Sequence, residues 1–242
     1  MPSRERDENH LAGVVGTALR RWLAQAQAAV MGPWHRFRMQ PDPSGVFQVQ
    51  GQWNQEVETI MTAIGKIAIG AWSEATDVPP VSRHAFIVSQ LAQTENFLVR
   101  MPDEVYNLIF AEINDAVNGG ADNEQVAERV DRVLEYSGSE RWPNRARTIA
   151  QTEVTRAYGA GTLAAGIEQS RVTGRMLQKR WDSEHDERVR VSHRQVDGQV
   201  LPLFMPFYVD GFPIQFPGDP MGPPETVINC RCDLVIMDER GR

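Results

Sequence analysis

Hydrophobic positions recur every three or four residues through the first three quarters of the chain, which predicts helices. Between Leu11 and Val30 they form one apolar stripe, and charged and amide side chains take the opposite face. Comparable stripes predict further helices at about 57–72, 86–99, 105–117 and 126–134.

Prolines and glycines mark the expected boundaries of these helices. The segment 31–45 holds Pro33 and two further prolines, so we expect it to end the first helix and form a connector. Gly119-Gly120 is a stop signal, and Asp122 is a candidate N-cap for the helix that follows.

The pattern changes in the last hundred residues. An Ala/Gly-rich helix is predicted at about 144–171, and its small side chains would let another element approach the helix backbone closely. Beyond residue 172, glycines and prolines separate short extended runs that predict strands at about 175–181, 199–203 and 232–237. The sequence therefore predicts an α+β fold: a helical region at 1–139, then a compact domain at 140–242 with a long helix and a small β-sheet.

Composition and charge limit the classes of protein that fit. The chain has 242 residues, of which 41% are hydrophobic, but no run approaches the roughly 18 apolar residues of a membrane-spanning helix. The charged N-terminus lacks a signal-peptide pattern, so we expect no export by the ordinary route. The net charge of −7 argues against a protein that coats nucleic acid. Residues 140–194 carry 11 Lys and Arg against 7 Asp and Glu, so a local basic face is possible there.

The Asn-Cys-Arg-Cys stretch at 229–232 is a candidate metal site. Positions i and i+2 of a strand project from the same face, so Cys230 and Cys232 could reach one ion. With His193, and with His185 or Asp186 as fourth ligand, they would suit a structural tetrahedral zinc. A disulfide between cysteines separated by one residue would be strained, so we expect both thiols to be reduced. The alternative to a metal site is that they are two buried, inert thiols.

Two other groups could carry chemistry or could be structural. His193 near Asp186 could act as a general base, or it could brace a loop through a hydrogen bond. Glu153 and Arg156 stand at i, i+3 on the predicted long helix and can pair there. Gly218 and the prolines around it fit a rigid wall under the sheet.

Enzyme signatures are absent from the sequence. The chain has no GxxxxGK[ST] phosphate loop, HExxH, GxSxG or paired CxxC motif. We therefore expect no enzymatic activity. A nuclease or ADP-ribosyl-transfer enzyme using His193, Asp186, Arg156 and Glu153 is the alternative, and a zinc-stabilised binding module is a third hypothesis.

Four stretches of the C-terminal region follow one another in an informative order. They are RTIAQTEVTRAYGAG (147–161), RVRVSHRQVDG (188–198) shortly after Trp181-Asp182, FPGDPMGPPE (216–225) and NCRC (229–232). In this order they resemble the Mu-F-like family of phage head morphogenesis, or minor capsid, proteins. The resemblance covers about Arg141 to Ile236, and the N-terminal helical region carries no motif of its own.

The resemblance implies a protein of the virion. Such proteins lie inside the phage head, associate with the portal and join the procapsid in few copies, which happens in the host cytoplasm. The N-terminal helices would then attach to the portal or to capsid and scaffold proteins, and the basic segment 140–194 could contact packaged DNA. Since the sequence ends soon after NCRC, we expect no activity of the kind that longer relatives carry in an appended nuclease or toxin-like domain.

Overall fold

The computed structural model describes residues 2–79, 85–135 and 141–238, and its α+β content confirms the predicted fold class. Its helices are α1 (Pro2–Phe37), α2 (Gly45–Gln48), α3 (Gln50–Ala75), α4 (Ala85–Leu98), α5 (Met101–Asn118), α6 (Asn123–Glu135), α7 (Arg141–Thr173), α8 (Val191–Val196) and α9 (Pro224–Val227). Its strands are β1 (Leu177–Asp182), β2 (Val200–Pro202), β3 (Phe207–Val209), β4 (Phe212–Ile214) and β5 (Asp233–Asp238).

The chain divides into two compact units, each assembled from separate segments of sequence. The sheet unit consists of Met1–Leu11, Met61–Thr94 and Thr148–Arg242, and the helical unit consists of Ala12–Ile60 and Glu95–Arg147. The domain boundary that the sequence predicts, between residues 139 and 140, lies outside the described residues and stays a prediction.

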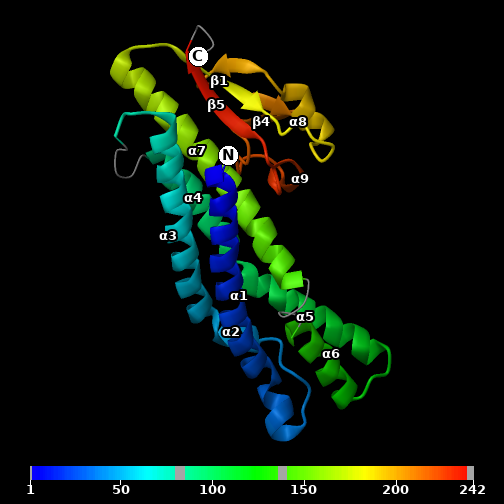
Figure 1. The fold of residues 1–242 in the computed structure, drawn as a ribbon. Coiled ribbons are helices and arrows are strands. Elements are labelled where there is room, and N and C mark those ends of the chain that lie inside the picture. The colour runs from blue at the N-terminus through cyan, green and yellow to red at the C-terminus, as the bar shows by residue number, and fades with distance from the viewer. Residues whose placement is uncertain (1, 80–84, 136–140, 239–242) are drawn as a thin grey trace. The chain divides into compact units, whose positions relative to one another are not determined.

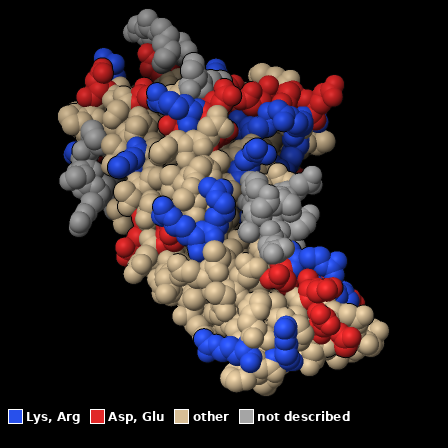
Figure 2. All heavy atoms as spheres, turned by 60° about the horizontal axis from the view of Figure 1, so that its bottom comes forward, with Lys and Arg blue, Asp and Glu red and all other residues tan. Residues whose placement is uncertain are grey.

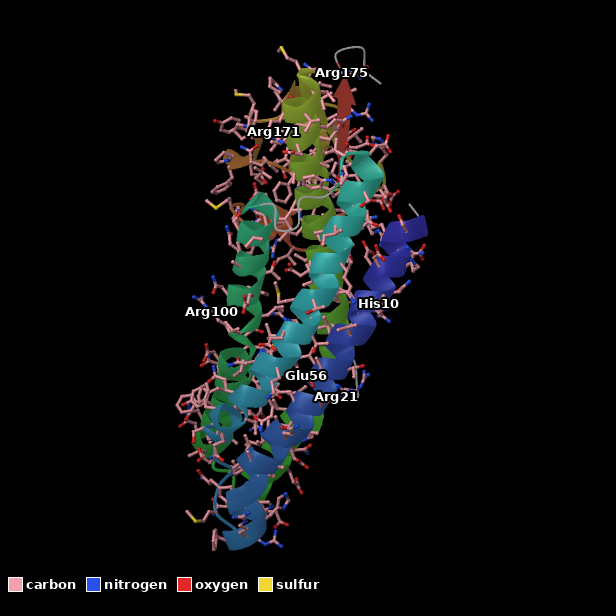
Figure 3. All side chains as sticks on the ribbon, turned by 90° about the vertical axis from the view of Figure 1, so that its left-hand side faces the viewer. His10, Arg21, Glu56, Arg100, Arg171 and Arg175 are labelled. Carbon is pink, nitrogen blue, oxygen red and sulfur yellow. The ribbon has the colours of Figure 1, made fainter. Side chains whose placement is uncertain are left out.

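Two buried tryptophans organise the core of the helical unit. The rings of Trp22 and Trp53 lie 5.3 Å apart between centroids. Each indole N–H donates to a backbone carbonyl, that of Trp22 to Val49 O at 3.2 Å and that of Trp53 to Leu98 O at 2.8 Å. A buried indole needs such an acceptor, so these bonds tie α1 and α3 to the chain segments around them. On the surface, Arg21 of α1 faces Glu56 of α3 at 3.7 Å (Figure 3).

The first helix is longer than the sequence predicts. It continues through Pro33 to Phe37, so the expectation that Pro33 and its neighbours would interrupt it was wrong. The loop that follows folds back onto this part of α1: Asp42 N–H donates to Val30 O at 3.0 Å, and Gly45 lies against the backbone of Ala29. A proline in a helix removes one hydrogen bond and crowds the carbonyl four residues earlier, here that of Ala29. We attribute the continuation of the helix to the contacts that the loop makes with Ala29 and Val30.

The start of α6 confirms the predicted cap. Asp122 Oδ1 accepts a hydrogen bond from Gln125 N–H at 2.9 Å, and Asp122 N–H donates to Gln125 Oε1 at 3.0 Å. This reciprocal pair is a capping box, which satisfies two N–H groups at the helix start. The predicted apolar side of the helix, including Val126, Val130 and Leu134, is buried.

The sheet unit contains an antiparallel three-stranded sheet in the order β2-β1-β5. Figure 1 shows β1 and β5 side by side, and along β1 buried residues alternate with partly buried ones, the period of two that a strand imposes. These strands lie close to the three predicted ranges. The β3–β4 hairpin was not predicted, although Asp210-Gly211 at its tip is a hairpin signal and both residues have positive φ.

Glycines of α7 let three other parts of the chain pack closely against this helix. A Cβ added at Gly159 would lie 2.5 Å from the Phe216 ring, and one added at Gly161 would lie 2.3 Å from Ala68 O of α3. One added at Gly166 would lie 3.0 Å from Ile236 of β5, which runs along α7 in Figure 1. The predicted close approach to this helix is thereby confirmed. Among the described residues, no helix has the length and apolar character needed to cross a membrane.

Replacing Gly161 tests this packing. We expect Gly161→Ala to lower the free energy of unfolding by about 1–3 kcal/mol, because its methyl group would overlap a backbone carbonyl of α3. Gly70→Ala is the matched control, since it lies in a helix with nothing within 4 Å of the added Cβ. It should be neutral or stabilise by up to about 1 kcal/mol in urea unfolding. Equal effects of the two substitutions would contradict the close approach.

Candidate functional site

The four signature stretches of the sequence meet in the sheet unit. Arg156 of the first donates from Nε to Gly218 O of the third at 3.1 Å. Thr155 Oγ1 of the first lies 2.6 Å from Cys230 O of the fourth. His193 of the second contacts the thiols of the fourth. Stretches separated by tens of residues therefore form one continuous set of contacts around α7.

A buried ion pair lies at the centre of the first stretch. Arg156 Nη1 is 2.8 Å from Glu153 Oε2, and Thr94 of α4 donates its hydroxyl to the same carboxylate oxygen at 2.7 Å. Glu153 is 2% exposed and Arg156 is 9% exposed. The pair that the sequence predicts does form, but in the core and not on a solvated face. Thr94 lies 59 residues from Glu153 and was missed, because nothing in the sequence links them.

The third stretch is a rigid wall, as predicted. Gly218 has a φ of 83°, and a Cβ there would lie 3.0 Å from Arg156 N, so the position requires glycine. Asp219 accepts hydrogen bonds from the backbone N–H groups of Gln215 at 2.7 Å and Met221 at 3.0 Å. Burial raises the pKa of Asp219, and these hydrogen bonds oppose that rise.

A buried lysine joins the sheet to this wall. Lys179 of β1 has no exposed surface, and its Nζ donates to Gln215 O at 2.9 Å and to Gln215 Oε1 at 2.7 Å. Nζ also lies 5.2 Å from the centre of the Phe207 ring, within the range of a cation–π contact. Burial lowers the pKa of Lys179 to about 8. This role was not predicted from the sequence, because a lysine in a strand is usually exposed.

Three of the predicted metal ligands come together. His193 Nδ1 lies 3.3 Å from Cys232 Sγ and 3.6 Å from Cys230 Sγ, and all three side chains are buried. Both cysteines are free thiols. The pKa of Cys230 is lowered, chiefly by its hydrogen bond with Cys232 and further by His193, whereas that hydrogen bond and burial raise the pKa of Cys232.

The two predicted choices for a fourth ligand lie elsewhere. His185 Nδ1 is 3.3 Å from Asp197 Oδ2, in a separate group with Asp182, and its side chain is 69% exposed. Asp186 accepts two hydrogen bonds from Arg231, at 2.7 Å and 2.6 Å, which hold the pKa of its carboxyl well below the usual range. Neither side chain belongs to the group formed by His193 and the cysteines.

The first turns of α1 supply a residue that the sequence analysis missed. Arg4 pairs with Asp233, donates to Thr155 Oγ1 at 2.6 Å and reaches Cys232 O at 3.4 Å. It lines a cleft of about 350 Å³ together with Glu74, Tyr158 and part of β5. Arg4 lies 229 residues from Asp233, and only the fold brings them together.

The four residues of the enzyme alternative all have structural partners. His193 Nε2 lies 3.0 Å from Thr226 O, and Nδ1 faces the two thiols, 3.3 Å from Cys232 Sγ. Asp186 is held by Arg231, and Glu153 and Arg156 hold each other in the core. In the structure these four residues take part in a bracing network, and His193 Nδ1 lies with the two sulfurs in a group that could hold a metal ion.

The ion pair of α7 can be tested against a more exposed pair that involves the same helix. Arg156→Met should cost about 3–5 kcal/mol in the free energy of unfolding, because Glu153 would stay buried without its counterion. Adding Glu153→Leu should restore part of that loss. Arg145 of the same helix pairs with Glu104 of α5 at 2.7 Å, but the Glu104 side chain is 45% exposed. Arg145→Met should cost no more than about 1 kcal/mol, because water can solvate the carboxylate that remains. A similar cost for the two arginine variants would contradict the buried network.

The low pKa of Lys179 predicts a pH dependence of stability. Between its native pKa of about 8 and its usual 10.5, the unfolded chain holds a proton that the folded chain has lost, so stability rises with pH. Relative to Lys179→Met, the wild-type free energy of unfolding should therefore increase from pH 8 to pH 10, by at most about 1.4 kcal/mol per unit. Urea unfolding in reducing buffer measures this difference, and parallel profiles for the two proteins would contradict it.

All four stretches lie within the region that comparisons with known proteins match. Residues 107–235 match the family described as Phage Mu protein F like protein. The chain is also similar to the minor head protein GP7 of Bacillus phage SPP1, with 30% identity over 141 residues. That similarity covers 58% of this chain and 43% of the phage protein, so the chain spans less than half the length of this relative. No solved structure is significantly similar to the chain. Since the family match covers more than half of its residues, the chain belongs to the Phage Mu protein F like family.

Proposed function

We propose that this protein is a minor head protein of a phage virion, which associates with the portal and is incorporated during procapsid assembly in the host cytoplasm. The observation that carries the proposal is the family match over residues 107–235, which includes all four signature stretches. The similarity to a protein named as a minor head protein supports the same role. The network of the sheet unit supports a structural and not a catalytic use of these residues.

The helical unit presents a surface suited to protein contact. Phe47 of α2 and Tyr106 of α5 lie 5.1 Å apart between ring centroids, and Phe110 stacks on Tyr106 at 5.8 Å. Phe47 is 40% exposed and Phe110 is 47% exposed. We call Phe47, Tyr106 and Phe110 the aromatic ladder. Exposed aromatic side chains in a row favour burial against a partner, and we propose the portal, with neighbouring capsid or scaffold proteins, as that partner.

DNA contact is a separate part of the proposal. Within the basic segment 140–194, Arg156 and Lys179 are buried, and Arg171 pairs with Glu168. Arg175, just beyond the end of α7 in Figure 3, and Arg194 remain exposed. In Figure 2 the basic side chains form small groups, several bordered by acidic ones. Such a surface would give a local contact with phosphates, with a shallow salt dependence, and not a continuous binding face.

Copurification tests the proposed role. The chain is coexpressed with the portal, scaffold and major capsid proteins of its own phage, and procapsids are isolated by sedimentation. We expect the chain in the procapsid fraction in few copies, together with the portal. Recovery only in the fraction free of particles would contradict the proposal.

Two matched variants locate the contact. Phe110→Glu places a charge on the aromatic ladder and should reduce the amount of chain bound to procapsids about tenfold or more, because an interfacial aromatic commonly contributes over 1.4 kcal/mol. Phe204→Glu changes a phenylalanine of the sheet unit that is 73% exposed and should leave binding unchanged. Both variants should keep the wild-type melting temperature. Normal binding of Phe110→Glu would exclude the ladder as the contact.

A further inference from the structure

His193, Cys230 and Cys232 have the spacing of ligands around one small metal ion. In tetrahedral zinc, with Zn–S of about 2.3 Å and Zn–N of about 2.0 Å, a nitrogen and a sulfur ligand lie about 3.5 Å apart. The two observed distances from Nδ1 to sulfur, 3.3 Å and 3.6 Å, lie on either side of that value. The three donor atoms all lie within 4.8 Å of one another.

The orientation of His193 leaves the correct nitrogen free to bind a metal. Its Nε2 lies 3.0 Å from Thr226 O, and a carbonyl oxygen can only accept a hydrogen bond. Nε2 therefore carries the proton, and in the neutral ring Nδ1 directs its lone pair at the two sulfurs. Metal-binding histidines are typically held in this way, with the other ring nitrogen donating to a carbonyl or carboxylate.

A second observation comes from Trp181 of β1. Its side chain is 1% exposed, and its ring lies edge-on to that of His193 with centroids 5.4 Å apart. The indole N–H interacts with the Cys232 side chain but makes no hydrogen bond of normal geometry within the described part of the chain. A buried donor without a strong acceptor is costly, and a metal-bound thiolate is a stronger acceptor than a neutral thiol.

We propose that His193, Cys230 and Cys232 bind a Zn²⁺ ion that links α8 to the segment just before β5. Two thiolates and one imidazole in a tetrahedral arrangement favour zinc over hard cations such as Mg²⁺ or Ca²⁺. Zinc binds four ligands, and the group of described residues supplies three of them, so the fourth coordination position would be taken by another ligand. The proposal is independent of the role in the phage head, because it rests only on this geometry.

Metal analysis of the purified full-length chain tests the proposal. Protein prepared in reducing buffer with zinc should retain roughly one zinc per chain after gel filtration. Removing the zinc with a chelator should lower the melting temperature, and adding zinc back should restore it. A zinc content near zero, with a melting temperature that neither chelator nor added zinc changes, would overturn the proposal.

Variants assign the ligands. Cys232→Ser and His193→Ala should each retain at least about tenfold less zinc than the wild-type chain. His185→Ala is the matched control, because His185 lies in the separate group with Asp182 and Asp197, and it should retain the wild-type amount. Loss of zinc from His185→Ala alone, with retention in the other two variants, would place the metal elsewhere and contradict the proposal.

Cobalt titration covers the case in which a ligand variant fails to fold. Co²⁺ replaces zinc in thiolate sites and gives an intense thiolate-to-metal absorption band near the ultraviolet, together with visible bands typical of tetrahedral geometry. The wild-type chain, stripped of metal and kept reduced, should show both at a ratio of about one Co²⁺ per chain, and zinc should abolish them. Absence of the thiolate band would favour two hydrogen-bonded thiols in the core and overturn the proposal.

Discussion

The architecture of the sheet unit depends on how closely other elements can approach the backbone of α7. At Gly159, Gly161 and Gly166 a side chain would overlap the FPGDP wall, α3 and β5 respectively. A helix with ordinary side chains would keep these elements several ångströms further away. The Ala/Gly-rich composition of this helix is thus a packing requirement. The positions of the wall and the sheet follow from it.

Close approach also brings polar groups into the core, where each needs a partner. Arg156 bridges Glu153, Thr94 and Gly218 O, and Lys179 takes both acceptors of Gln215. A buried charge without a partner would lower the free energy of unfolding by several kcal/mol. Packing arrangements that break these contacts are therefore disfavoured. Glu153 and Arg156 of the first stretch are thus used, in this chain, in packing α7 against the wall and α4. That use fits the role in head assembly that we propose.

The sequence predicted the elements with strong local signals. The stripe of α6 and its Asp122 cap were correct, because both depend on residues only a few positions apart. Pro33 was misjudged, because the loop that returns to α1 supports the helix beyond it. The β3–β4 hairpin was missed because each strand has only three residues, although Asp210-Gly211 could have identified it. Within the candidate site, Cys230 and Cys232 do lie together with His193, although both precede β5 and the strand geometry expected for them was wrong. Arg4 and Thr94 join the network only through long-range packing.

We infer that α7, the sheet and the signature stretches form one cooperative structure. Native-state hydrogen exchange tests it most directly, because it measures the free energy of opening at each amide. We expect the slowest amides of β1, β5 and the 148–166 part of α7 to open with one common free energy, and we expect Gly161→Ala to lower that free energy equally in all three. If the amides of β1 and β5 exchange with a lower free energy of opening that Gly161→Ala does not change, the sheet and α7 do not form one cooperative structure.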